Sequence, residues 1–305
     1  MTFIYLVILI GTSIILECII FQNTKGKQFL LQDDWNTRQG KNYDILFIGN
    51  SRVWSQVNSE LISKSLHLKV FNLTQDGRGI DLLWAKFKVY IKTNKPPGQI
   101  YLIYDPYFLE GRTGNTFYGK EDYLSYLFHD RIGINHLFKN ETGFHQYETY
   151  IPLIRYIGYK EIFFDHVLGT TIADARQKRN IEFGINIFDF KWGQEKAPIT
   201  KWSAPLETNL KLVKIQYVDS FKTYCDQNNI KLHLFYPPQS WPSYKLVSDA
   251  TQRKLKSYAQ KQGLEFVDFN KELYNDSTLF YNHMHLNKKG STLFTAQLMQ
   301  QYFGK

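Results

Sequence analysis

Short apolar runs and longer amphipathic stretches alternate along most of the chain. Apolar runs bounded by Gly, Pro or Asp predict five strands, at residues 44–49, 69–73, 99–104, 231–236 and 264–269. Apolar residues at helical spacing predict helices at residues 58–65, 80–92, 206–228, 248–262 and 288–302. Strands that alternate with helices indicate a parallel sheet with helices on both faces. We therefore expect an α/β fold, a three-layer α/β/α sandwich around a five-stranded parallel sheet.

The amino terminus breaks this pattern with a longer apolar stretch. Residues 3–21 are nearly all apolar, and Glu17 is the only charge among them. This length is about what a helix needs to cross a bilayer core. The stretch has no basic start and no small-residue cleavage site of the secretory kind. We expect an uncleaved transmembrane signal-anchor at residues 1–22 and a polar linker at 23–40; a buried core helix is the alternative.

The charges beside this stretch bear on its orientation. Lys25 and Lys27 follow it, and only the chain terminus precedes it. A count of positive charges would place the body of the protein in the cytoplasm. A family resemblance implies instead that the body is extracytoplasmic, so the charge count and the resemblance conflict.

About a hundred residues interrupt the alternation after the third strand. Residues 107–205 are rich in Tyr, Phe, Gly and His. We expect a domain at 41–305 that carries an inserted subdomain or lid at about 107–205, partly helical around 147–164. Insertions of this kind commonly carry specificity.

Composition narrows the classes of function. The chain has 305 residues, of which 43% are hydrophobic and 16% aromatic, and its net charge is +9. The lysines are scattered and form no basic-aromatic module, so we expect no nucleic-acid partner, although a mildly basic surface suits anionic membranes or glycans. Cys18 and Cys225 are not expected to pair, and no Cys/His cluster has zinc spacing. We expect neither a metal nor a cofactor.

The first predicted strand ends in Gly49-Asn50-Ser51-Arg52. An apolar run that ends in Gly-X-Ser indicates a buried strand that delivers a serine into a turn before a helix. A hydroxyl at that place is exposed at the carboxyl end of the sheet, with helix amides close by to stabilise negative charge. Ser51 is therefore a candidate nucleophile. The alternative is a serine that only caps the helix.

A second motif lies near the carboxyl terminus, where Asn282-His283-Met284-His285 is followed by Leu-Asn-Lys-Lys-Gly. The two motifs together resemble the SGNH/GDSL hydrolase superfamily, from about residue 44 onward with the insertion excepted. The resemblance implies a flavodoxin-like SGNH fold, with Ser51 as the nucleophile and His285 as the base. His283 is an alternative base, and His285 has the alternative of a structural, hydrogen-bonded histidine.

The segment Asn72-Leu73-Thr74-Gln75-Asp76-Gly77 resembles the second block of the family. There a glycine donates its amide to the oxyanion, which implies that Gly77 and Ser51 supply the two oxyanion amides. A plain turn glycine is the alternative for Gly77.

Two positions depart from the family pattern. Asn282 stands where the family has the acid of Asp-X-X-His, and an asparagine can orient the histidine but cannot stabilise its charged form. Replacing this acid costs about 10⁴ in rate in a serine protease. Some members of the superfamily nevertheless work as Ser-His dyads, so the resemblance still allows activity.

The other departure is Asp105, which stands where the third block has an oxyanion-donating asparagine. An ionised Asp105 would repel an oxyanion, so it must be turned away, protonated or given another role. Arg52 could bind a carboxylate or phosphate of a substrate, and an ion pair at the surface is the simpler expectation. Both residues are possible substrate contacts.

The layout adds a narrower resemblance, to the SGNH-like proteins that work beside membrane-bound O-acyltransferases. It implies a membrane-anchored protein with an extracytoplasmic body, on the periplasmic side of the inner membrane if the source is bacterial. We expect a serine-dependent O-acyl esterase or O-acyltransferase that acts on a cell-surface polysaccharide through an acyl-Ser51 intermediate.

The alternative is a catalytically weak or inactive module that binds glycan, or a membrane acyltransferase partner, through aromatic side chains of the insertion. The candidate aromatic residues are Tyr147, Tyr150, Tyr156, Tyr159, Trp192 and Trp202. Ordinary core packing is the simpler expectation for them.

Overall fold

The computed structural model describes eight stretches of the chain, residues 2–24, 40–75, 77–109, 128–139, 144–153, 183–192, 214–245 and 247–304. They belong to two compact units. The first unit comprises Met1–Lys41, Ala85–Thr93 and Arg112–Gln177. The second comprises Asn42–Trp84, Asn94–Gly111 and Lys178–Lys305.

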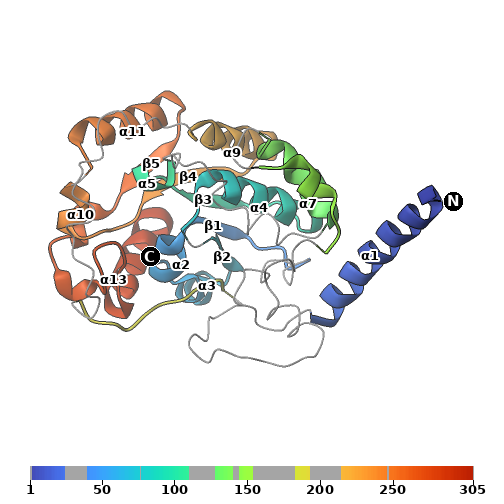
Figure 1. Cartoon of the computed structure of the whole chain (residues 1–305). Helices are drawn as coiled ribbons and strands as arrows, with labels where there is room; N and C mark the ends of the chain where they lie inside the picture. Colours follow the sequence, from blue (N-terminus) through green and yellow to red (C-terminus); the bar gives the residue numbers. More distant parts are fainter. Residues whose placement is uncertain are drawn as a thin grey trace. The chain divides into compact units, whose positions relative to one another are not determined.

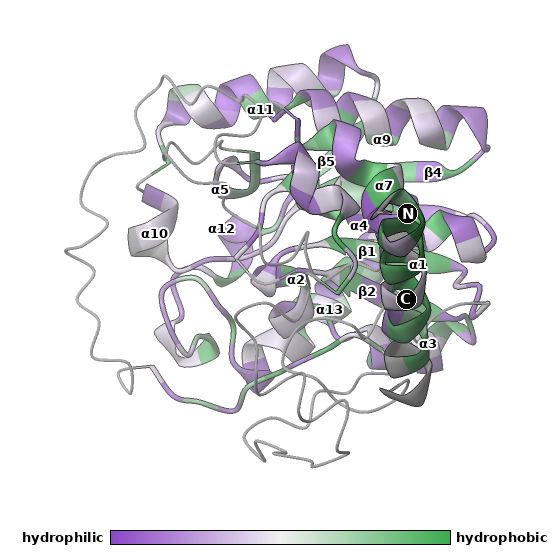
Figure 2. Ribbon diagram, turned by 45° about the vertical axis from the view of Figure 1, so that its right-hand side comes forward, coloured by the Kyte–Doolittle hydropathy of each residue, from purple (hydrophilic) through white to green (hydrophobic). Residues whose placement is uncertain are grey.

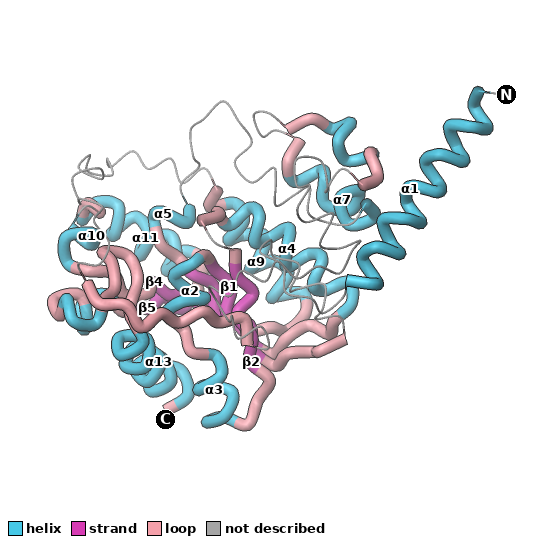
Figure 3. Tube along the Cα trace, turned by 60° about the horizontal axis from the view of Figure 1, so that its bottom comes forward, coloured by secondary structure: helices cyan, strands magenta, loops and turns pink. Residues whose placement is uncertain are grey.

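The second unit is built on a parallel sheet of five strands, which form its centre in Figures 1 and 3. The strands are β1 (Ile45–Gly49), β2 (Val70–Thr74), β3 (Gln99–Ile103), β4 (Lys231–Tyr236) and β5 (Glu265–Asp268). Their order is β2-β1-β3-β4-β5 and every pairing is parallel. The predicted fold class is confirmed. The order reverses direction between β1 and β3, the point where such sheets bind ligands beyond the carboxyl ends of their strands.

Helices cover both faces of the sheet, as predicted (Figure 1). One face carries α2 (Ser51–Gln56), α3 (Ser59–Leu66) and α13 (Lys288–Phe303), and the other carries α9 (Gln216–Gln227) and α11 (Asp249–Lys261). Short helices follow three of the strands: α5 (Pro106–Leu109), α10 (Trp241–Lys245) and α12 (Asn270–Leu273). The helix predicted at 206–228 is thus observed from Gln216, and residues 206–213 lie outside the described ones.

Aromatic side chains fill the layer between the sheet and α13. The ring of Tyr101 stacks on Phe47 at 4.8 Å and on His233 at 4.6 Å, and Tyr302 of α13 packs against it edge-on at 4.8 Å. Offset stacks and edge contacts at these separations are the favoured aromatic geometries. Part of the chain's high aromatic content therefore serves the core beneath the candidate site.

The turn from β1 into α2 depends on Gly49. A Cβ atom at this position would lie 2.2 Å from Val53 Cγ2 and 2.8 Å from Ile103 Cγ2. Only glycine lets the helix begin this close to the strands. Asn50 then caps the helix, because its Oδ1 accepts the Arg52 amide at 3.0 Å. The capping residue is thus Asn50, which leaves the Ser51 hydroxyl for another contact.

The first unit contains α1 (Thr2–Thr24), the second part of α4 (Ile80–Thr93), α7 (Phe128–Ile134) and the 3₁₀ turns η2 (Asn135–Leu137) and η3 (Gln146–Tyr150). Figure 2 shows α1 as apolar along most of its length. Glu17, its one charge, is buried: Oε1 lies 3.5 Å from Arg131, and Oε2 accepts the Leu153 amide at 3.1 Å.

Among the described residues, no helix combines the length and the apolar character that a membrane span requires. The limits of the anchor, the linker and the insertion stay predictions. Of the helix expected around 147–164, residues 147–153 are described; the 3₁₀ turn η3 ends at Tyr150, and residues 151–153 are not helical.

The Gly49→Ala substitution should lower the free energy of unfolding by about 1–3 kcal/mol, because the added methyl group has no space beside Val53 and Ile103. The matched control is Gly98→Ala, at an exposed glycine where a Cβ atom would meet nothing closer than Asp44 O at 3.6 Å. Urea unfolding followed by tryptophan fluorescence measures both. Equal stability of the two variants would contradict this account of the turn.

Candidate active site

Ser51, His285 and Asn282 meet at the carboxyl edge of the sheet in the second unit. The Oγ atom of Ser51 lies 2.9 Å from His285 Nε2. The other ring nitrogen, Nδ1, lies 3.0 Å from Asn282 Oδ1. The structure therefore brings together, in a hydrogen-bonded line, the three residues that the sequence indicated as nucleophile, base and orienting residue.

The Asn282 side chain is held in one orientation by the backbone around it. Its Oδ1 atom accepts the amides of Met284 and His285, each at 2.9 Å. Turning the side-chain amide over would set its NH₂ group against these two donors. The oxygen must therefore face the histidine ring, so Nδ1 carries the proton and donates it to Asn282. The Nε2 atom is left with a lone pair that accepts the Ser51 hydroxyl.

Backbone contacts fix the loop that carries the histidine. The carbonyl of Met284 accepts Gln56 Nε2 at 2.8 Å, and the carbonyl of His283 accepts the Ser240 amide and hydroxyl at 3.1 and 2.9 Å. Gln56 belongs to α2, the helix that begins at Ser51. The helix that carries Ser51 and the loop that carries His285 are thus hydrogen-bonded to each other. Of the two candidate bases, His285 contacts Ser51 Oγ, whereas His283 accepts hydrogen bonds through its carbonyl.

The Leu-Asn-Lys-Lys-Gly motif has a packing role beside the site. Asn287 caps α13 by accepting the Gly290 amide at 3.1 Å, and its Nδ2 donates to Thr278 O at 2.7 Å. A Cβ atom at Gly290 would lie 2.2 Å from Leu279 O. The glycine lets α13 start against the loop that leads to His285.

The environment of His285 favours the neutral ring. Burial lowers the pKa of His285 to about 3, and the nearby Arg52 and His283 act in the same direction. A neutral imidazole is the form that can accept a proton from serine. Asn282 provides no negative charge to stabilise the imidazolium that would then form.

Arg52 and Asp105 form a buried ion pair next to Ser51. Arg52 Nη1 lies 2.8 Å from Asp105 Oδ2, and the side chains are 2% and 0% exposed. The guanidinium also donates to the Pro237 carbonyl, and its carbon lies 5.2 Å from the centre of the Tyr236 ring. The expectation of a surface ion pair at Arg52 is therefore wrong, because the partner follows β3 inside the fold. Neither side chain is accessible to a substrate in this structure.

Asp105 has the other role that the sequence left open. Its Oδ1 accepts the Phe108 amide at 2.8 Å while Oδ2 faces Arg52. Burial raises the pKa of Asp105, and the Arg52 guanidinium and the amides of Phe108 and Tyr107 oppose this shift. Donors on both oxygens match an ionised carboxylate. The charge of Asp105 is paired with Arg52, so an acid can stand at this position without facing an oxyanion.

The loop after β2 runs beside the Ser51 turn. The Gln75 amide donates to the Gly49 carbonyl at 3.1 Å, and Asn72 Nδ2 donates to Val57 O at 2.8 Å. Two residues beyond Gln75, Gly77 has φ +64°, a left-handed conformation that glycine adopts readily. Its amide, and that of Ser51 in the first turn of α2, remain the predicted oxyanion donors.

Sequence reasoning missed an aromatic strip formed by residues 183–192, yellow in Figure 1. The strip passes the free edge of β2, where Phe183 O accepts the Asn72 amide at 3.1 Å, and the Asn186 amide donates to Trp54 O at 2.8 Å. Phe188 then packs on Tyr281, whose ring stacks on that of His285 at 5.4 Å. The strip and Tyr281 thus form an aromatic wall next to the histidine.

The structure describes three of the six aromatic residues that were candidates for glycan binding. Trp192, at the end of this strip, is 36% exposed, whereas Tyr147 and Tyr150 of the first unit are 63% and 48% exposed. Full core packing is therefore wrong for these three. Tyr156, Tyr159 and Trp202 lie outside the described residues. In the part of the chain that the structure describes, no group of three or more His, Cys, Asp or Glu side chains could hold a metal ion.

Removing one partner of the Arg52–Asp105 ion pair should strongly lower the free energy of unfolding. Arg52→Met should lower the free energy of unfolding by about 3–5 kcal/mol, because it leaves the Asp105 carboxylate buried and unpaired. The double variant Arg52→Met/Asp105→Asn should recover part of this loss, since the neutral amide keeps an acceptor for the Phe108 amide. Urea unfolding measures both.

The control is Lys64→Met, which breaks an exposed pair with Glu60 at 2.7 Å and should change stability by about 0.5 kcal/mol or less. An Arg52→Met variant as stable as this control would contradict the assigned role of the buried pair.

Comparisons with known proteins give no match in sequence and remote matches in structure. The sequence matches no protein-family model and no curated protein. A candidate acylhydrolase from Bacteroides fragilis is a structural match at TM-score 0.40 and 14% identity, over 91% of this chain and 95% of that one. A GDSL-like lipase from Bacteroides thetaiotaomicron matches at TM-score 0.37 and 10% identity, over 84% and 86%. Likenesses this remote establish no activity, so the functional conclusion rests on the geometry of the site.

Proposed function

We propose that the protein is a serine-dependent acyl-ester hydrolase or acyltransferase of the SGNH type. The observation that carries the proposal is the line from Ser51 Oγ to His285 Nε2 at 2.9 Å and from His285 Nδ1 to Asn282 Oδ1 at 3.0 Å. It lies at the carboxyl edge of the sheet, after the strand that borders the reversal in strand order. A nucleophile, a base and an orienting group in this arrangement are the requirements of acyl transfer.

The first half of the reaction makes an acyl-enzyme. Ser51 Oγ attacks the ester carbonyl as its proton passes to His285 Nε2. The oxyanion that forms is held by the amides of Ser51 and Gly77. When the tetrahedral intermediate collapses, the ester C–O bond breaks and the leaving alkoxide takes the proton from His285. The products are an alcohol and an acyl group on Ser51.

The second half returns the serine. A water molecule or a sugar hydroxyl gives its proton to His285 and attacks the acyl carbon. The bond between the acyl carbon and Ser51 Oγ breaks, and Oγ takes the proton back from His285. Attack by water yields a carboxylic acid and makes the protein an esterase, whereas attack by a sugar hydroxyl yields a new ester and makes it a transferase.

Asn282 sets the expected efficiency. In a serine protease, replacing the acid by asparagine costs about 10⁴ because the histidine takes the wrong tautomer. Here the two backbone amides on Asn282 Oδ1 impose the right one, so that part of the loss is avoided. What is still lacking is a negative charge beside the imidazolium. We expect a competent but slow site.

For the substrate, we propose an acyl ester of a cell-surface polysaccharide, handled by a membrane-anchored body outside the cytoplasm, with a membrane-bound O-acyltransferase as partner. The support is the apolar amino-terminal stretch together with the family resemblance of the Ser51 and His285 motifs. Protease digestion of intact cells tests the location. Cleavage of the body without lysis supports it, and full protection would contradict it.

A non-catalytic, glycan-binding module is the second candidate. It is favoured by the partner of His285 Nδ1, which is the neutral amide of Asn282 where a carboxylate would stabilise the imidazolium, and by the partly exposed aromatic residue Trp192 in the strip next to the site. Covalent labelling of Ser51 separates the two candidates.

A fluorophosphonate probe should label the full-length protein, because it reacts with a serine that a neighbouring base has activated. Ser51→Ala should abolish labelling, and His285→Ala should slow it by about 10²-fold or more. Ser63→Ala, in α3, is the matched control and should label normally. In-gel fluorescence measures the rate. Absence of labelling in folded wild-type protein would leave the binding module as the surviving candidate.

Asn282→Asp should raise the rate of labelling and change its dependence on pH. With the pKa of His285 at about 3, the neutral base predominates from about pH 5 to about pH 8, so the wild-type rate should be nearly flat there. A carboxylate at 282 raises the pKa of His285 by stabilising the imidazolium. The rate of the variant should therefore exceed that of wild type at about pH 8 and fall as the pH drops through the raised pKa.

The pH series of labelling rates for the two proteins measures this effect. A wild-type rate that falls about thirtyfold between about pH 8 and about pH 5 would show an ordinary histidine and contradict the proposed environment.

A further inference from the structure

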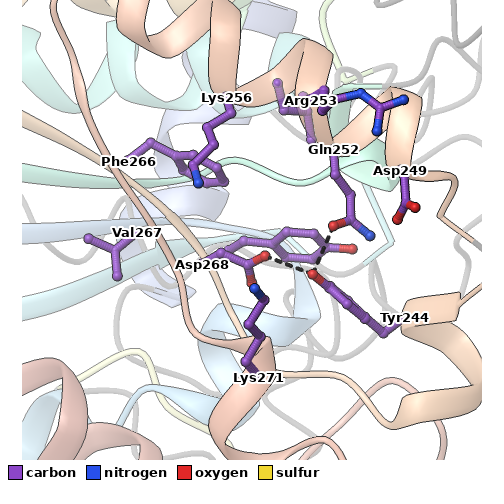
Figure 4. A pocket seen from close by; sticks show the side chains of 11 residues that line it. Tyr244, Asp249, Gln252, Arg253, Lys256, Phe266, Val267, Asp268 and Lys271 are labelled. Carbon is purple, nitrogen blue, oxygen red and sulfur yellow. Dashed lines mark hydrogen bonds between the residues drawn. The ribbon is translucent and has the colours of Figure 1, made fainter.

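A cavity of about 430 Å³ lies at the carboxyl ends of β4 and β5 (Figure 4). Its walls come from the ends of these strands and from α10, α11 and α12. The residues that line it are Tyr236, Tyr244, Asp249, Gln252, Arg253, Leu255, Lys256, Phe266, Val267, Asp268 and Lys271. Ser51, His285 and Asn282 are not among them. A volume of this size is typical of sites for small molecules.

Three cations surround the cavity. Arg253 and Lys256 extend from α11 and Lys271 extends from α12 (Figure 4). All three are exposed, and among the described residues their side chains have no salt-bridge or hydrogen-bond partner. The carboxylates in the wall are Asp249 and Asp268. The cavity therefore carries a net positive charge that an anionic group could neutralise.

Two acceptors in the wall of the cavity share the hydroxyl of Tyr244 as a hydrogen-bond donor. The Tyr244 hydroxyl lies 2.9 Å from Gln252 Oε1 and 3.1 Å from Asp268 Oδ2 (Figure 4). A phenol has a single proton, so it serves one of these acceptors at a time. Burial and Asp268 raise the pKa of Tyr244, so it keeps this proton. The remaining acceptor is suited to a hydroxyl donor from a ligand.

The rest of the wall is apolar. Leu255, Phe266 and Val267 provide a surface that a bare inorganic anion would leave uncovered. A sugar ring has C–H groups for such a surface and hydroxyls for the acceptors. A carboxylate or phosphate on the ring would meet the cations.

We propose that this cavity binds an anionic sugar, with its charge among Arg253, Lys256 and Lys271 and its hydroxyls on Asp268 and Gln252. In the strand order, β4 and β5 are the second and third strands from β1, which puts the cavity roughly 10–15 Å from the Ser51 strand along the same edge. The site thus fits a neighbouring residue of an ester-bearing saccharide; that role rests on the proposed function, whereas the binding itself does not.

Isothermal titration calorimetry on the full-length protein tests the binding. The four probes are glucuronate, a hexose phosphate, glucose and inorganic phosphate. We expect glucuronate or the hexose phosphate, or both, to bind at least roughly tenfold more tightly than glucose and inorganic phosphate, because only they satisfy the cations and the acceptors together. The preferred anion identifies the charged group. Equal affinity for glucose, or for inorganic phosphate, or no binding of either anionic sugar, would overturn the proposal.

Variants place the ligand. Arg253→Ala and Lys256→Ala should each weaken anionic-sugar binding by roughly fivefold, the upper range for single exposed charges. Lys261→Ala, which removes an exposed charge from the same helix outside the cavity, should change nothing. Binding unaltered by the first two variants would overturn the site. Adding Ser51→Ala to each of these three variants should leave its affinity for the anionic sugar unchanged. A failure of sugar binding can therefore be distinguished from a failure of acyl transfer at Ser51.

Discussion

The site depends on one buried interaction, the Arg52–Asp105 ion pair. Arg52 belongs to the first turn of α2, directly after Ser51, while Asp105 follows β3 and the Pro237 carbonyl follows β4. One guanidinium therefore joins the carboxyl ends of three adjacent strands. A buried charge of this kind needs every partner in place, because an unpaired carboxylate inside the fold is strongly destabilising. These contacts fix the turn that presents Ser51 against the carboxyl ends of the strands.

The carboxyl end of α2 is fixed by the loop that carries His285. Gln56 at the end of α2 binds the Met284 carbonyl, and α13 returns a hydrogen bond from Ser291 to the Gln56 carbonyl at 2.9 Å. The 2.9 Å contact between Ser51 and His285 is thus set by groups at both ends of α2. Asn282 adds orientation through its oxygen, although it adds no charge. The proposed acyl-transfer site thus has its serine, its histidine and the orienting asparagine in a hydrogen-bonded line.

Much of this could be predicted from the sequence, for identifiable physical reasons. The strands are short, mainly apolar runs bounded by Gly, Pro or Asp, so all five could be located to within about one residue at each end. Ser51 and His285 could be named from two short motifs and their resemblance to a known superfamily. The structure gives the glycines of these motifs a steric reason: side chains at Gly49 and Gly290 would collide with Val53 and with Leu279.

The rest depends on contacts between distant segments. Arg52 and Asp105 look like two separate charges until β1 and β3 are paired side by side. Apolar residues alternate with polar ones along part of residues 183–192, at Phe188, Phe190 and Trp192. This short pattern does not indicate that the segment passes the edge of β2 and reaches Tyr281. The cavity at β5 likewise gathers residues from α10, α11 and α12, whose charges resemble ordinary solvated helix faces in the sequence.

The central claim is that this scaffold makes Ser51 carry an acyl group. The direct measurement is peptide mass spectrometry of the full-length protein after brief mixing with p-nitrophenyl acetate and an acid quench. The account predicts one acetyl group, on the peptide that contains Ser51, which disappears when the sample is left to turn over before the quench. Folded protein that shows no acetylated Ser51 at any time, or an acetyl group only on other residues, would contradict it.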